Sequence, residues 1–211
     1  MKLRKMLSAL LGAALVVGLL PAASAEASAP TGRGNGFFAN GTPITITAQA
    51  PAGAQEAQLD GLTTGTSAYI SWQDGEQTLY VGVPSNVLVF GGGDGASAPV
   101  TVESTSITMT GGTVNCLFGG NLGMQNTDAA STSRVTGEVS IKVSGTDAVV
   151  LNLLHGGGQY NTCVEGTATI EITGADLTQG AYGGCYINGG VHGNGLEGSR
   201  DIANGTMNTN A

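Results

Sequence analysis

Positively charged residues are scarce in this chain. Its 211 residues include 7 Lys and Arg against 15 Asp and Glu, so the formal net charge at pH 7 is −8. Three of the seven cations lie within the first five residues, which leaves four against all 15 acidic residues after Ala25, a net charge of −11. Neutralising nucleic-acid phosphates requires clustered Lys and Arg. We therefore expect no nucleic acid partner and no binding to anionic membrane surfaces.

Cysteine is also rare. Cys116, Cys163 and Cys185 are odd in number, and none of them forms a Cys-x-x-Cys spacing, so a zinc site is weakly supported. In an oxidising compartment one pair could form a disulfide, which would leave the third thiol without a partner in the chain. The sequence does not fix the pairing, and the simplest interpretation is three small buried side chains.

A long apolar run occurs only at the start of the chain, and it is short for a membrane span. Residues 6–20 carry no charge, follow a cationic start and lead to Ala23-Ser24-Ala25. A membrane helix needs about 20 residues, whereas this order of segments is typical of a cleaved signal peptide. We expect residues 1–25 to direct export and the mature chain to be extracellular or on the cell surface, without a membrane span. The alternative is an uncleaved anchor.

Aromatic residues make up only 5% of the chain, yet several of them stand before glycines. Phe90, Phe118 and Tyr182 each precede at least two glycines, and His155 takes the same position in a fourth copy, at successive distances of 28, 37 and 27 residues. The glycine pairs are Gly91 and Gly92, Gly119 and Gly120, Gly156 and Gly157, and Gly183 and Gly184. Such a period is typical of stacked repeats. We predict an internal column of rings, and glycines that supply left-handed backbone for sharp turns.

Five short segments alternate apolar and polar residues, as strands with one wet face do. Their apolar pairs are Ile44/Ile46, Ile70/Trp72, Ile107/Met109, Ile141/Val143 and Ile170/Ile172. One such unit cannot bury its apolar face alone, so the units must stack. We predict an all-β protein, a right-handed parallel β-helix over residues 37–192. Residues 26–36 would be a flexible linker and residues 193–211 a polar C-terminal tail that caps the stack.

The alternative fold is an antiparallel β-sandwich built from hairpins. The two folds differ in strand register. In the stacked arrangement Ile107, Ile141 and Ile170 lie on adjacent strands, and Lys142 lies beside Glu171.

Two carboxylates are candidates for chemistry. Asp147 and Asp176 each stand two residues after a glycine that ends a repeat strand. Stacking would bring them to about 5 Å, the separation in a retaining glycosidase, or let them share a calcium ion. Against this, Asp is a common solvated turn residue. No other cofactor is indicated, and we interpret His155 as a packed ring.

Hydroxyl side chains would gather on the outer face of the predicted strands. They are Thr45, Thr47, Ser71, Thr108, Thr110, Ser140, Thr169 and Thr173. A flat polar face of this kind suits weak binding of polysaccharide, although Thr is also simply common in strands.

The segments Val89–Gly93, Leu117–Gly120 and Ala181–Gly184, with linking segments at 135–141 and 166–170, resemble the repeats of secreted, adhesin-like bacterial β-helix proteins. The likeness covers about residues 40–190. It implies a solenoid displayed outside the cell, without established catalytic residues. We therefore expect an adhesin-like structural or binding protein that contacts surface glycans or other extracellular polymers. The alternative is a β-helix polysaccharide lyase or glycosidase that uses Asp147 and Asp176.

Overall fold

A computed structural model describes the backbone of residues 27–126, 128–177, 181–182, 185–187, 190–192 and 204–210. Side chains are described for residues 27–126 and 128–175. The predicted signal peptide lies outside the described residues.

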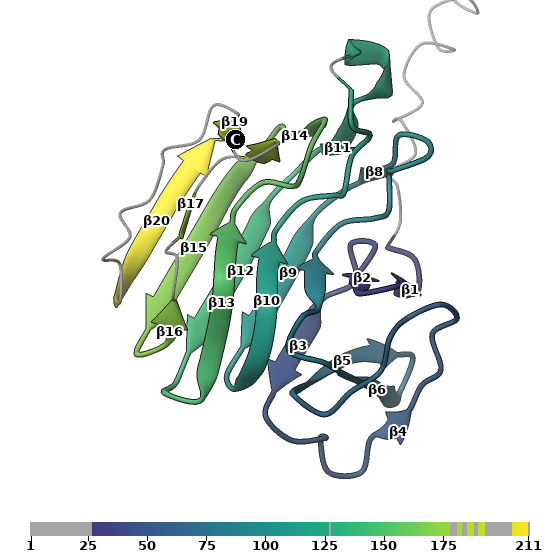
Figure 1. Cartoon of the computed structure of the whole chain (residues 1–211), viewed down its shortest axis with the longest axis vertical. Coiled ribbons are helices and arrows are strands. Elements are labelled where there is room, and N and C mark those ends of the chain that lie inside the picture. Colours follow the sequence, from purple (N-terminus) through teal and green to yellow (C-terminus); the bar gives the residue numbers. More distant parts are fainter. Residues whose placement is uncertain are drawn as a thin grey trace, which may run out of the picture.

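The segments rich in Val, Ile and Thr form strands, and the described structure is almost entirely β (Figure 1). The strands of the first half are β1 (Thr31–Arg33), β2 (Gly36–Phe38), β3 (Ile44–Thr47), β4 (Gln55–Glu56), β5 (Ala68–Asp74), β6 (Gln77–Val83), β7 (Leu88–Phe90), β8 (Thr101–Val102), β9 (Thr105–Met109) and β10 (Gly112–Phe118). Those of the second half are β11 (Ser133–Val135), β12 (Val139–Ser144), β13 (Ala148–His155), β14 (Thr162–Val164), β15 (Thr167–Thr173), β16 (Asp176–Leu177), β17 (Ala181–Tyr182), β18 (Cys185–Ile187), β19 (Gly190–His192) and β20 (Asn204–Asn210). A 3-10 turn at Ala129–Ser131 is the one described helical element.

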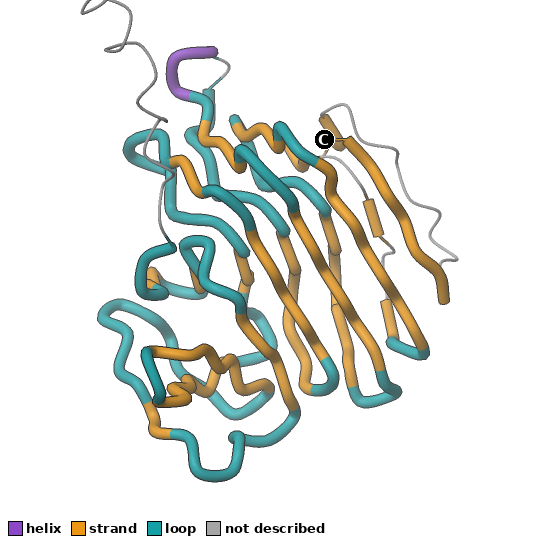
Figure 2. Tube along the Cα trace, turned by 180° about the vertical axis from the view of Figure 1, so that it is seen from behind, coloured by secondary structure: helices purple, strands orange, loops and turns teal. Residues whose placement is uncertain are grey.

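The strands pair into mixed sheets. An eight-stranded sheet has the order β20-β15-β12-β9-β3-β5-β6-β4, and a seven-stranded sheet has the order β1-β2-β7-β10-β13-β16, with β17 also on β13. A three-stranded sheet, β14-β11-β8, and the hairpin β18–β19 complete the set. From β7 to β15 the chain visits the seven-, three- and eight-stranded sheets in the same cyclic order three times (Figure 2).

The predicted register of the apolar strands is confirmed. Ile107 pairs with Ile141 and Ile141 with Ile170, all in parallel strands. Lys142 pairs with Glu171, and Lys142 Nζ lies 2.9 Å from Glu171 Oε2. These repeats are therefore neighbours in one parallel array, and not the hairpins of the alternative fold.

The segment that holds Ile70 and Trp72 does not join the parallel array. Its strand, β5, runs antiparallel to β3 and forms a hairpin with β6. Gly75 takes a positive φ of 61° in the turn between them. Side-chain alternation is the same in parallel and antiparallel strands, so the pattern of residues 68–72 did not reveal this direction. Part of the predicted linker is also a strand, because β1 pairs with β2.

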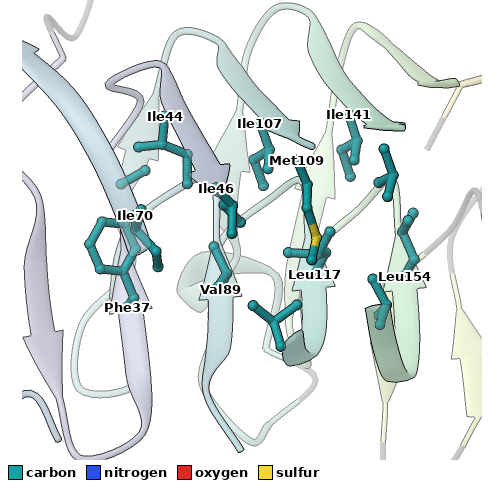
Figure 3. Packing of buried hydrophobic residues seen from close by; sticks show 14 of the residues in the cluster. Phe37, Ile44, Ile46, Ile70, Val89, Ile107, Met109, Leu117, Ile141 and Leu154 are labelled. Carbon is teal, nitrogen blue, oxygen red and sulfur yellow. The ribbon is translucent and has the colours of Figure 1, made fainter. Parts of the chain in front are cut away.

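The main core lies between the three sheets. Each sheet contributes a row of buried residues: Ile107, Ile141 and Ile170; Val89, Leu117 and Leu154; and Val102, Val135 and Val164. Figure 3 shows Ile44, Ile107 and Ile141 following one another along this core. Each coil thus covers the apolar edge of the next, which satisfies the need of single units to stack.

The predicted column of aromatic rings is present, and it begins one repeat earlier than expected. The rings of Phe38, Phe90, Phe118 and His155 stack at centroid distances of 5.1, 4.8 and 5.4 Å and are all buried. His155 pairs through its backbone with Tyr182, whose side chain lies outside the described residues. The Phe rings form a second cluster, separate from the main core, because they alternate along their strands with core residues such as Leu117.

The glycines after these rings serve a different purpose from the one predicted. Positive φ occurs instead at Gly112, Gly145 and Gly174, in the turns that follow β9, β12 and β15. Close approach between coils is what requires glycine at positions 91, 92, 119 and 120, whereas Gly183 and Gly184 lie outside the described residues. A Cβ on Gly91 would lie 2.6 Å from the carbonyl oxygen of Gly119, and one on Gly119 would overlap with that of Gly156.

Candidate functional site

A groove of about 340 Å³ opens on the outer face of the β5–β6 hairpin. Its lining consists of Glu56, Thr64, Gly65, Thr66, Tyr69, Tyr80 and Gly82. The volume is near the lower end of the range of about 300–1,000 Å³ that is common for small-molecule sites.

Two tyrosines form the floor of the groove. In the hairpin register Tyr69 pairs with Gly82 and Tyr80 with Ser71, so the tyrosines are diagonal neighbours on one face. Their ring centroids are 6.0 Å apart, and the ring planes meet at 62°. The residues between, such as Ile70, point into the core. Both tyrosines are only partly buried, so part of each side chain is available to a ligand.

One wall of the groove is the segment of residues 64–66. The backbone N–H of Gly65 donates to the carbonyl oxygen of Gly82 at 3.0 Å. A Cβ on Gly82 would overlap with the carbonyl oxygen of Gly65, so glycine at position 82 lets the segment approach the sheet. Thr64 and Thr66 are exposed on either side of this contact. Hydroxyl groups that can donate and accept therefore line the groove beside the aromatic floor.

Glu56 provides the charge of the groove. It lies on β4, which runs parallel to β6, and pairs with Tyr80. The three cations among the described side chains, Arg33, Arg134 and Lys142, form ion pairs with other carboxylates. No Lys or Arg occurs between residues 34 and 133. The exposed carboxylate of Glu56 is thus not compensated by any described cation.

The predicted hydroxyl face begins beside the groove. Thr45 lies next to Ser71 on one side and Thr108 on the other, and the row then reaches Lys142. Part of its hydrogen-bonding capacity is used internally. Ser71 Oγ donates to the carbonyl oxygen of Thr45 at 3.3 Å. The face is therefore less free to bind a ligand than the residue types alone suggest.

The two candidate carboxylates do not occupy equivalent places. Asp147 is exposed in the turn between β12 and β13. Asp176 begins β16, where its backbone pairs with Val149, two residues beyond Asp147. The side chain of Asp176 lies outside the described residues, so the catalytic and calcium interpretations remain predictions. The described side chains contain no group of three or more His, Cys, Asp or Glu suited to a metal ion.

The cysteines lie away from the groove. Cys116 packs in the aromatic cluster, and burial raises the pKa of its thiol above the ordinary value of 9.0. Cys163 is half-buried on β14, and both are free thiols. The side chain of Cys185 lies outside the described residues.

Sequence reasoning missed Glu56, Tyr69 and Tyr80. The signal was the Asp74-Gly75 turn, since a hairpin at that point places positions 69 and 80 on one face.

Comparison with known proteins gives no match to a family model, to a curated protein or to a solved structure. Within the part of the chain that the structure describes, no helix has the length and apolar character needed to cross a membrane.

Proposed function

We propose that this chain is an exported, adhesin-like protein that binds glycans of cell surfaces or extracellular polymers, and that its scaffold is a right-handed parallel β-helix. The three parallel stacks and their cyclic order support the scaffold. Crossover connections between parallel strands are right-handed in nearly all known cases, which supports the hand. The signal-like start of the sequence supports export.

The groove with Tyr69 and Tyr80 is the observation on which the binding proposal depends. The apolar C–H faces of a sugar ring pack on aromatic rings, and its hydroxyls pair with polar groups at the edge. Here two partly exposed rings at 6.0 Å lie beside the hydroxyls of Thr64 and Thr66. The two rings lie on one face of the hairpin and contact each other, which restricts their side-chain freedom before a ligand binds.

The proposal is tested by removing one ring from the groove. The mature chain is screened on a glycan array with and without calcium, and the affinity of the best glycan is measured by titration calorimetry. Tyr80→Ala should weaken binding at least about tenfold, which corresponds to about 1.4 kcal/mol. The hydroxyls and the scaffold remain in this variant.

The matched control is Tyr160→Asn, which removes a tyrosine outside the groove. Tyr160 has a positive φ of 66°, a conformation that Asn tolerates better than most residues. This variant should bind like the parent. Equal affinity of Tyr80→Ala and the parent for every retained glycan would contradict the assignment of the groove, and a chain that retains no glycan would contradict the proposed function.

A further inference from the structure

Building on the proposed function, we infer that the groove recognises glycans that carry a protonated amino group, with Glu56 as the carboxylate that pairs with that group. The preference follows from three properties of the groove: its charge, its aromatic floor and the absence of a competing cation among the described residues.

Glu56 is positioned to meet a ligand on the aromatic floor. Its strand pairs with β6 so that Glu56 and Tyr80 are direct neighbours, at a strand spacing of about 4.8 Å. The carboxylate is exposed and is therefore accessible to a ligand in the groove. A sugar stacked on Tyr80 would present its ring substituents to Glu56, and an ammonium group would form a charge-assisted hydrogen bond there.

The tyrosine rings favour the same sign of charge. The face of an aromatic ring is negative and attracts an ammonium group within about 6 Å of its centroid. Tyr69 and Tyr80 present two such rings at an angle of 62°, beside the carboxylate. Cation–π attraction and the carboxylate therefore act together on one positive charge, whereas a neutral sugar uses only the packing surface.

The surroundings of the groove disfavour anionic ligands. Glu56 itself is negatively charged, and residues 34–133 contain no Lys or Arg. Each described cation is already paired with another carboxylate. A uronic acid or a sulfated sugar would meet repulsion without a compensating partner. Glycans with carboxylate or sulfate groups are therefore the ligands that the groove rejects.

A glycan fits the groove better than a basic peptide does. The lining supplies two threonine hydroxyls, which match a ligand rich in hydroxyl groups. The groove lies outside the apolar core, and its lining contains no aliphatic side chain that would hold an apolar peptide residue.

The test compares three oligosaccharides of equal length on the mature chain by titration calorimetry. They are a β-1,4-linked tetramer of glucosamine, its fully N-acetylated form and a tetramer of galacturonic acid, at a pH that protonates the amine. The glucosamine tetramer should bind about tenfold more tightly than the acetylated one, and the galacturonic acid tetramer should not bind. Glu56→Gln should remove most of the preference for the glucosamine tetramer over the acetylated one, and the cation–π attraction of the two tyrosines accounts for what is left. Glu76→Gln, which removes the same charge outside the groove, should leave the affinity nearly unchanged.

Several results would overturn the inference. Equal or tighter binding of the acetylated or galacturonic acid tetramer would do so and leave the proposed function standing. An equal loss in Glu56→Gln and Glu76→Gln would show that overall charge, and not the groove, attracts the amine. Binding of tetralysine as tightly as the glucosamine tetramer would show that the groove recognises cations without regard to sugar. If no tetramer binds and no glycan is retained on the array, the proposed function itself fails.

Discussion

Replacing Gly91 by Ala should destabilise the stack strongly, although the same change usually costs little on a protein surface. The new Cβ would lie 2.6 Å from the carbonyl oxygen of Gly119 and 2.9 Å from Cβ of Thr105. Neither neighbour can move alone. Gly91 N–H donates to Phe118 O at 2.8 Å, and Thr105 Oγ1 donates to Gly119 O at 2.7 Å.

The free energies set the direction and size of the effect. Overpacking costs about 1–3 kcal/mol, and stretching two hydrogen bonds adds about 1 kcal/mol each at most. Ala also lowers the conformational entropy of the unfolded chain, which offsets about 0.4–1 kcal/mol of this destabilisation. The net loss is about 3 kcal/mol, which lowers Tm by about 6–12 °C for a chain of this size.

The assay is thermal unfolding followed by circular dichroism, with Gly174 as the comparison. Gly174 has a positive φ of 70°, and no heavy atom lies within 4 Å of the point where a Cβ would stand. There Asn should be tolerated better than Ala, because Asn adopts left-handed backbone more readily. At Gly91 the order should reverse, because Asn is larger. A Tm for Gly91→Ala within about 2 °C of the parent would refute the role of close approach.

Three further predictions concern the aromatic cluster and the cysteines. Phe118→Ala should lower the free energy of unfolding by about 3–5 kcal/mol in denaturant titrations, because the Phe118 ring is buried between Phe90 and His155. Leu151→Ala, at a position that is 38% exposed, should lower it by about 0.5 kcal/mol or less. Comparable losses in the two variants would contradict the stacking argument. In the native protein Cys163 should react with a thiol reagent and Cys116 should not, because burial raises the pKa of the Cys116 thiol. The thiol of Cys116 ionises at a lower pH in the unfolded chain than in the folded one. Its contribution to stability is therefore complete below pH 9.0 and declines as the pH rises further, and Cys116→Ala should lack this decline. Rapid labelling of Cys116 in the native protein would contradict its protection.

The parts of the fold that depend on side-chain periodicity could be predicted from the sequence. Ile107, Ile141 and Ile170 repeat the same alternation before the same turn, so their register followed from stacking alone. The ion pair of Lys142 and Glu171 followed from that register. Phe38 was not predicted to belong to the aromatic column, because Ala39 and Asn40 follow it where the later copies have glycines.

The parts that depend on strand direction or on contacts between distant segments could not be predicted in this way. Alternation does not distinguish the antiparallel β5 from a parallel repeat. The glycines after Phe90 and Phe118 looked like turn residues, because the crowding that requires them comes from the neighbouring coil. The groove likewise required the positions of both arms of the hairpin and of Glu56 on a third strand.

The eight-stranded sheet closes its parallel run with an antiparallel strand on either flank, β5 against β3 and β20 against β15. A further coil cannot be appended outside these strands without displacing one of them. Lengthening by gene duplication would therefore proceed from within, by copying a middle coil such as residues 112–144 between its neighbours. The protein could become longer in this way while the groove on the β5–β6 hairpin keeps its shape.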